Sequence, residues 1–317
     1  MIELAATVVP PSLDASPTWT HWQLDPLTVL PIVAAGLAYG AGVRRLGRSG
    51  RGWPRARTIA FASGLGALAL ALVSPVDAFA DVSFPVHMAQ HLLLTLVAPP
   101  LLALGAPLTL ALRSVSSEAR RRFLVPVLHG RVASFLSRPV VGWALFVLVP
   151  FVVHLSPLFD AALRSSVVHA LEHALWLSAA LVYWWPIVGS DPTPRPMTYP
   201  ARLLSLFLVI PAQSFLALAL YAADAPLYPT YSGLPAPWGP DALADQQGAA
   251  AMMWLAGNFA MVGALLLAAF AWKREDDARQ RRLEDREDRQ ATRPGDPSGA
   301  VKGSPSDAQS SIPPSRL

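Results

Sequence analysis

The sequence predicts an all-α protein that crosses a membrane seven times, with its N-terminus outside and its C-terminus in the cytoplasm. The chain has 317 residues, of which 53% are apolar and only 15% are charged, and the apolar residues come in long blocks. Seven of these blocks approach the length of about 20 residues that a helix needs to cross a hydrocarbon core. Arginines gather in alternate connections between the blocks, which is the charge pattern of polytopic membrane proteins.

The seven predicted spans are separated by polar or proline-rich connections. They cover residues 26–43, 58–75, 84–112, 140–158, 166–189, 201–223 and 246–272. The third span is longer than one crossing needs and contains Pro99 and Pro100, so a kink or a break is expected within it. Pro150 and Pro211 are expected to bend the fourth and sixth spans.

The arginines predict the direction of each span. Residues 44–57 and residues 113–138 contain six arginines each, whereas residues 1–25, 77–83 and 222–245 contain no lysine or arginine. Because basic connections remain in the cytoplasm, the first two ranges are predicted to lie inside and the last three outside. The net charge of +4 is therefore explained by topology and does not indicate nucleic-acid binding.

The chain is expected to have three regions. An extracytoplasmic tail covers residues 1–25, the transmembrane domain covers 26–272, and a cytoplasmic tail covers 273–317, where a charged helix to residue 292 precedes a disordered end. The first residues lack a basic segment and a long apolar stretch, so no cleavable signal peptide is predicted. The chain contains no cysteine, which excludes disulfides and thiolate metal ligands.

Five of the seven histidines lie at one level of the predicted bundle, near the outer ends of three spans. These are His87 and His91 in the third span, His154 in the fourth, and His169 and His173 in the fifth. Each pair four residues apart shares one helical face, which suits two ligands of one ion. Ionisable groups in spans are costly and face the bundle interior, so metal binding or proton chemistry is predicted for them. His21 and His129, outside the spans, are expected to have ordinary roles.

Other side chains at the same level are secondary candidates. Met88, Met252 and Met253 offer thioether sulfurs, which favour Cu(I), although a methionine in a span usually fills the core. Glu172 lies between the two histidines of the fifth span. Four aspartates at the outer ends of spans are expected either to orient imidazoles or simply to cap helices. These are Asp77, Asp160, Asp224 and Asp245.

The spacing leaves several chemistries open. Residues 169–173 form the H-x-x-E-H pattern of a zinc-peptidase class, in which Glu172 would act as the general base. The matching segment of the third span has Gln90 where a carboxylate would be needed. Haem ligation would use single histidines facing one another across helices, and pairs four residues apart favour chelation of an ion instead.

Several motifs occur in order along residues 25–272. They are SPVDAFAD, FPVHMAQHLLLTLVAPPLLALGAPL, VVHLSPLFDAAL, HALEHALWLSAALVYWWPIVG, PAQSFLALAL and LYPTY. Together they resemble the seven-helix cytochrome c oxidase assembly factor family, CtaG. The resemblance implies a multi-pass protein of the bacterial plasma membrane that helps to mature a haem-copper oxidase at the step of copper insertion.

We therefore expect an assembly factor rather than an enzyme, embedded in the lipid bilayer, with copper as the metal that it handles. Copper would come from a periplasmic carrier or as the free ion and pass to a cytochrome c oxidase subunit by ligand exchange. The expected ligands are His87, His91, His154, His169 and His173, with Met88, Met252, Met253 and Glu172 as secondary ones. The alternatives are a membrane metallohydrolase that uses the H-x-x-E-H helix, and a structural platform without a metal role.

Overall fold

A computed structural model describes residues 22–232 and 241–291. The described residues form helices and no strands, which confirms the all-α prediction. The predicted outer tail as far as residue 21, part of the predicted outer connection at 233–240, and the predicted disordered end from residue 292 lie outside the described residues.

The helices follow the order of the predicted spans. They are α1 (Pro26–Arg48), α2 (Arg55–Leu72), α3 (Pro75–Ala80), α4 (Phe84–Leu92), the π-helix η2 (Leu93–Val97), α5 (Ala98–Leu104), α6 (Pro107–Ser114), α7 (Ser117–Ala119), the π-helix η3 (Arg120–Leu124), α8 (Val125–Leu128), α9 (Arg131–Leu136), α10 (Pro139–His154), α11 (Leu158–Arg164), α12 (Ser166–Val188), α13 (Tyr199–Tyr221), α14 (Pro229–Ser232) and α15 (Ala242–Ala291). Each predicted span coincides with one of these helices or with a run of them.

Contacts divide the chain into two units, Met1–Ala269 and Phe270–Leu317. The second unit contains the charged part of α15, where side chains are almost all exposed, and the structure thus forms the predicted charged helix through Ala291. The first unit contains the remaining helices and the histidines.

Five segments of the described chain are long and apolar enough to cross a membrane, or six if α10 and α11 form one span bent by 68°. Helix α12 has 23 residues, which is enough for a crossing. It is not among the five segments, because its two histidines, Glu172 and its aromatic residues lower its mean hydropathy. Seven crossings and their direction therefore remain a prediction.

Large apolar side chains point outward from the helices of the first unit. Leu27 on α1 is 84% exposed, Phe215 on α13 is 68% exposed, and Phe259 on α15 is 72% exposed. A soluble protein rarely exposes apolar surface on this scale, whereas lipid tails cover it in a bilayer. The chain is therefore a membrane protein.

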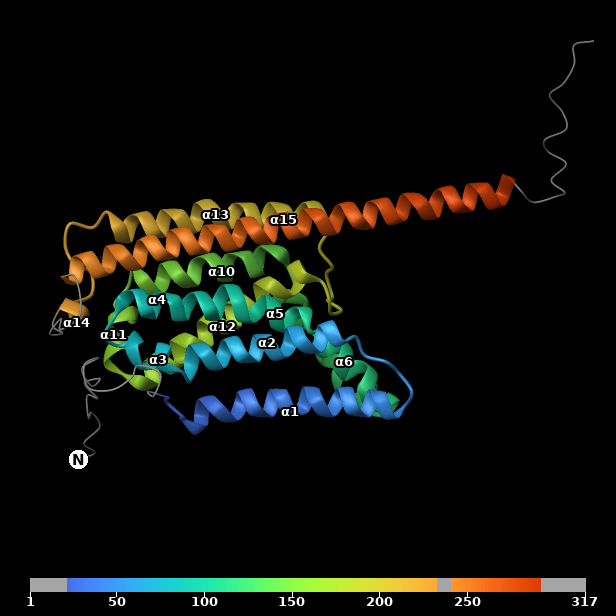
Figure 1. Ribbon diagram of the computed structural model, residues 1–317, viewed down its shortest axis with the longest axis horizontal. Helices are drawn as coiled ribbons and strands as arrows, with labels where there is room; N and C mark the ends of the chain where they lie inside the picture. The colour runs from blue at the N-terminus through green and yellow to red at the C-terminus, as the bar shows by residue number, and fades with distance from the viewer. Residues whose placement is uncertain (1–21, 233–240, 292–317) are drawn as a thin grey trace, which may run out of the picture. The chain divides into compact units, whose positions relative to one another are not determined.

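The arginine-rich connections and the helix ends that carry the histidines lie at opposite ends of the first unit (Figure 1). The connection between α1 and α2, helix α6, and the connection between α12 and α13 lie at one end, which we call the arginine end. Helices α3, α11 and α14 lie at the other, which we call the histidine end. This separation is the arrangement that the charge pattern of the sequence requires.

The expected irregularity in the third span lies next to the histidines. Helix α4 ends at Leu92, the residue after His91, and passes into the π-helix η2, and α5 begins at Ala98 with prolines in its first turn. Pro99 has no N–H to donate to the carbonyl of Thr95. The indole of Trp184 on α12 donates to that carbonyl instead, at 2.8 Å. Proline thus leaves the carbonyl of Thr95 available for a hydrogen bond that joins the third span to α12.

Two further prolines lie inside continuous helices. Pro150 is within α10 and Pro211 is within α13. The sharp bend between α10 and α11 falls after His154 rather than at Pro150. Helix α12 packs against α10, α11, α5 and η2. It therefore lies beside the helix that carries His154 and beside the continuation of the helix that carries His87 and His91.

Candidate metal centre

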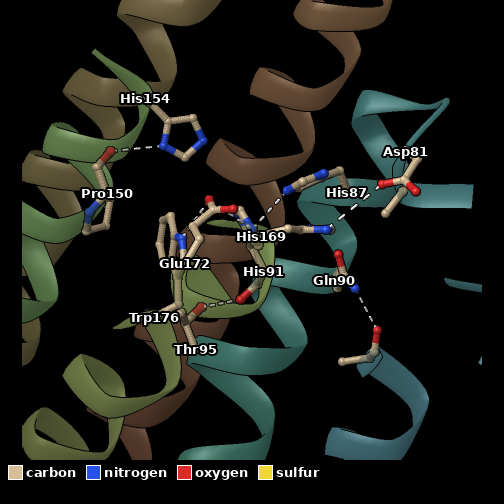
Figure 2. Close-up of polar contacts among 12 residues, drawn as sticks. Asp81, His87, Gln90, His91, Thr95, Pro150, His154, His169, Glu172 and Trp176 are labelled. Carbon is tan, nitrogen blue, oxygen red and sulfur yellow. Dashed lines mark hydrogen bonds and ion pairs between the residues drawn. The ribbon is translucent and has the colours of Figure 1, made fainter. Parts of the chain in front are cut away.

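The two histidine pairs meet between α4 and α12. The Nε2 atoms of His87 and His91 are 3.0 Å apart, and His91 Nε2 lies 3.6 Å from an Oε1 atom of Glu172. The ring centroids of His87 and His169 are 5.2 Å apart, and those of His91 and His173 are 5.8 Å apart. Figure 2 shows His87 and His91 on α4 opposite His169 and Glu172 on α12. The structure thus brings both predicted pairs together.

His154 approaches this group from α10. Its ring centroid lies 6.3 Å from that of His91, and its Nδ1 atom lies 2.9 Å from the carbonyl oxygen of Pro150. Because a carbonyl only accepts hydrogen bonds, the Nδ1 atom carries the proton and Nε2 keeps its lone pair. His154 therefore presents a potential ligand atom, although it lies at the edge of the cluster.

The cluster is deeply buried except on one side. His87 is 0% exposed, and His91 and Glu172 are each 2% exposed. The side chain of His169 is 15% exposed, and its Nδ1 atom lies 4.0 Å from the carboxylate of Asp81, which is 57% exposed. His169 and Asp81 therefore lie on the side of the cluster that is open to the surroundings.

Two groups of three side chains have ligand atoms close enough to hold one ion. The first group is His87, His169 and His173, and the second is His87, His91 and Glu172. Within each group the ligand atoms all lie within 4.8 Å of one another. Small side-chain movements would bring such atoms to the about 2.0–2.2 Å that nitrogen and oxygen ligands adopt around a first-row ion.

Several buried polar atoms of the cluster have no hydrogen-bond partner among the described residues. Buried polar atoms are normally hydrogen-bonded, and leaving one unpaired costs about 1–3 kcal/mol. The unpaired atoms here are Nδ1 of His91, Nε2 of His154, His169 and His173, and Oε2 of Glu172. Five unpaired nitrogen and oxygen atoms within one cluster have the chemistry of a set of metal ligands.

The tautomer of His87 is fixed by a tyrosine that the sequence analysis did not select. Tyr231 on α14 donates its hydroxyl proton to the carbonyl of Ala80 at 2.7 Å, and the same hydroxyl lies 3.3 Å from His87 Nδ1. Because that proton is already committed, the hydroxyl oxygen accepts from Nδ1–H. His87 Nε2 is then left with its lone pair facing His91. Hydrogen bonds of this kind orient metal-binding imidazoles.

Aromatic side chains enclose the remaining sides. Trp176 donates its indole N–H to Glu172 Oε1 at 3.1 Å, and its ring centroid lies 4.5 Å from that of His91. Phe159 on α11 lies 5.0 Å from His87 and 5.2 Å from His154, measured between ring centroids. These rings keep water away from the inner histidines.

Three of the four predicted aspartates accept hydrogen bonds from groups other than imidazoles. Asp77 accepts from the amide of Gln90 at 2.6 Å. Asp160 accepts the N–H of Thr230 at 3.0 Å, and Asp245 accepts that of Phe84 at 2.8 Å. Asp224 is exposed. Helix capping and positioning, the simpler of the two expectations, therefore describes them, and the aspartate that does lie near an imidazole is Asp81.

The three candidate methionines have different surroundings. Met88 and Met253 are buried and line a largely apolar cavity together with His91 and Thr95. Met252 is only partly buried and does not line that cavity. Two of the three thioethers thus line the same cavity as His91.

These features define a class, namely a polytopic helical membrane protein with a buried cluster of histidines and one carboxylate. Residues 37–275 match the model of the family described as cytochrome c oxidase caa3 assembly factor, Caa3_CtaG. The chain belongs to this family, which confirms the resemblance drawn from its motifs.

Curated relatives occur in mycobacteria. The chain is 36% identical over 279 residues to the uncharacterized protein Mb0105 of Mycobacterium bovis. It is 34% identical over 280 residues to the uncharacterized protein ML1998 of Mycobacterium leprae. Each comparison covers 86% of this chain but only 42% of the relative, so the chain spans less than half the length of these relatives. No solved structure matches the chain significantly.

Proposed function

We propose that this protein supports the maturation of cytochrome c oxidase by holding a copper ion transiently in the histidine cluster and passing it to an oxidase subunit. The observation that carries the proposal is the gathering of His87, His91, His169 and His173, together with Glu172, in one buried cluster that has unpaired ligand atoms. Membership of an oxidase assembly family supplies the biological setting.

Copper suits this ligand set. Imidazole nitrogens bind both oxidation states of copper, and thioethers favour Cu(I). The chain has no cysteine, so nothing in it would hold copper as tightly as a thiolate does. A set of neutral imidazoles with one carboxylate can release its ion to an acceptor, which a delivery protein must do. Met88 and Met253 serve as secondary ligands beside His91.

The proposed setting is the bacterial plasma membrane, with the histidine end facing outward. Copper reaches the exposed side of the cluster from a periplasmic carrier or as the free ion. Transfer to the oxidase requires only the exchange of ligands, so no catalytic turnover is needed. Asp81 lies on the side where the ion arrives, and its carboxylate attracts a cation.

The zinc-peptidase alternative has less structural support. A general base would need its carboxylate directed at a water on an ion held by His169 and His173. Glu172 instead accepts the indole N–H of Trp176 and lies beside His91. These contacts suit a ligand or a counter-charge. A Glu172→Gln variant that keeps its metal but loses a demonstrable peptidase activity would favour the hydrolase.

The deciding test removes one imidazole from each pair. We expect His91→Ala combined with His173→Ala to leave an inserted protein whose host membranes contain an oxidase deficient in copper. Replacing a polar residue by Ala makes a span more apolar, so insertion should survive. Oxidase activity and copper content would be measured in membranes from cells carrying the variant, with the protein level checked by immunoblot.

The matched control is His129→Ala, because His129 is exposed and lies outside the cluster. That variant should leave oxidase activity unchanged. Extra copper in the medium should partly restore activity in the double variant, since mass action offsets a weakened site. Full activity with normal copper content in the double variant would contradict copper delivery and leave the platform role.

A further inference from the structure

We infer that the cluster offers one copper ion two alternative positions that share His87, and that the ion moves between them by ligand exchange. The outer position consists of His87, His169 and His173, and the inner position consists of His87, His91 and Glu172. The inference rests on the proposed function, because it concerns how the same cluster takes up and passes on copper.

His87 can serve only one position at a time. Its Nδ1 atom donates to Tyr231, which leaves Nε2 as the one atom with a free lone pair. A single lone pair binds a single ion. The two ligand sets therefore compete for His87, and the cluster holds one ion rather than two.

The two positions differ in access. The outer set contains His169, which is partly exposed and lies 4.0 Å from the exposed carboxylate of Asp81. All three members of the inner set are at most 2% exposed. An ion that arrives from the surroundings meets the outer set first, and the inner set lies behind it, against Trp176.

The two positions also differ in charge. Three neutral imidazoles form the outer set, whereas the inner set includes the carboxylate of Glu172. An ionised carboxylate at this depth is costly unless a cation accompanies it. The polar contacts of Glu172 among the described residues are with Trp176 and His91, and neither carries a permanent positive charge. A metal ion in the inner position supplies the missing counter-charge, which favours movement inward.

The exchange needs no electron transfer. As the ion moves inward, its bonds to His169 and His173 break and bonds to His91 and Glu172 form, while the bond to His87 persists. In the metal-free cluster His91 Nε2 donates to His87 Nε2 across 3.0 Å. Once His87 holds the ion, the proton of His91 shifts to its unpaired Nδ1 atom, which frees Nε2 as a ligand.

The experiment counts copper on the purified full-length protein and on variants that remove one set at a time. The outer-set variant carries His169→Ala and His173→Ala, and the inner-set variant carries His91→Ala and Glu172→Gln. Each protein would be equilibrated with Cu(II), freed of unbound ion and analysed for copper content. Electron paramagnetic resonance would report the ligands, because nitrogen and oxygen donors give different spectra.

We expect one copper per chain in the unmodified protein and in both double variants, with weaker binding and a different spectrum in each variant. The His87→Ala variant should lose bound copper, since both positions need this residue. His87→Gln, which keeps a polar side chain, should behave in the same way. His129→Ala is the control, and size-exclusion chromatography would establish that each variant remains folded.

Two copper ions per unmodified chain would overturn the sharing of His87, as would full binding by both folded His87 variants. Complete loss of copper from one folded double variant would indicate a single composite site, which would refute the two positions but leave copper delivery intact. Absence of copper from the unmodified protein would instead refute the proposed function itself. The two failures are thus distinguishable.

Discussion

The two ends of the Phe84–Ser114 segment are held by aspartates from distant parts of the chain, but with different strength. At the histidine end, Asp245 on α15 accepts one N–H, that of Phe84, at 2.8 Å. At the arginine end, Asp191 accepts the N–H groups of Leu108 and Thr109 at 3.0 and 2.7 Å and the Thr109 hydroxyl at 2.6 Å.

The end with more hydrogen bonds anchors the segment, and the other end carries the candidate metal ligands. At the arginine end Asp191 accepts from two backbone N–H groups and one hydroxyl at the start of α6, where N–H groups have no partner within the helix. At the histidine end the side chains of the cluster retain unpaired atoms. The firmly held end fixes the segment, and the less firmly held end carries the side chains that would rearrange in the proposed copper exchange.

We expect the largest effect that separates the two ends to be their exposure to opposite sides of the membrane. The chain has no cysteine, so single substitutions give unambiguous labelling sites. We expect Asp224→Cys to react with a membrane-impermeant maleimide in intact cells and Arg51→Cys to react only after the membrane is opened, as the arginine pattern requires. Labelling in the reverse order would place the cluster in the cytoplasm and contradict uptake from outside.

The next effect concerns stability. Asp191→Ala leaves three donors without their partner, whereas Asp245→Ala leaves one. A lost bond to a buried donor costs about 1–3 kcal/mol, and a lost helix cap costs about 0.5–2 kcal/mol. We therefore expect Asp191→Ala to lower the thermal unfolding midpoint of the detergent-solubilised protein more than Asp245→Ala does.

Asp224→Ala is the matched control for this pair, because Asp224 is an exposed aspartate, and its midpoint should stay near that of the unmodified protein. Equal midpoints for the Asp191 and Asp245 variants would show that the two ends are anchored alike. A lower midpoint for Asp245→Ala would reverse the comparison.

The sequence predicted the parts of the molecule that depend on local pattern. The apolar blocks located the helices, the prolines located the irregular third span, and helical spacing placed His87 with His91 and His169 with His173 on shared faces. The cluster was also predicted, because the five histidines lie at similar depths in their spans and polar groups within spans face the bundle interior. These inferences depend only on residues that are close to one another in the sequence.

The parts that were missed depend on contacts between distant residues. Tyr231 reaches a histidine that is 144 residues away along the chain, and Asp191 reaches Leu108 over a separation of 83 residues. Periodicity contains no information about such pairs. Asp81 resembles Asp77 in the sequence. The packing of α3 against α4 lets Asp77 accept a hydrogen bond from Gln90, whereas Asp81 lies near His169 on α12.

The smallest predicted effect concerns the hydroxyl of Tyr231. Tyr231→Phe removes the hydroxyl that accepts from His87 Nδ1, so the tautomer with the proton on Nδ1 loses one of its acceptors and the Nε2 lone pair is available less often. Loss of a hydrogen bond of this kind lowers metal affinity by about 10–100-fold. Competition with a copper chelator would measure the change in the purified protein.

Tyr228→Phe provides the matched control, because the hydroxyl of Tyr228 donates to the backbone carbonyl of His154 at 3.2 Å and not to an imidazole. Its copper affinity should change much less. Since His87 belongs to both ligand sets, Tyr231→Phe should also weaken copper binding when added to either the outer-set or the inner-set variant. A loss confined to one of these backgrounds would mean that His87 serves only one position, and unchanged affinity in all of them would show that Tyr231 positions α14 without tuning the histidine.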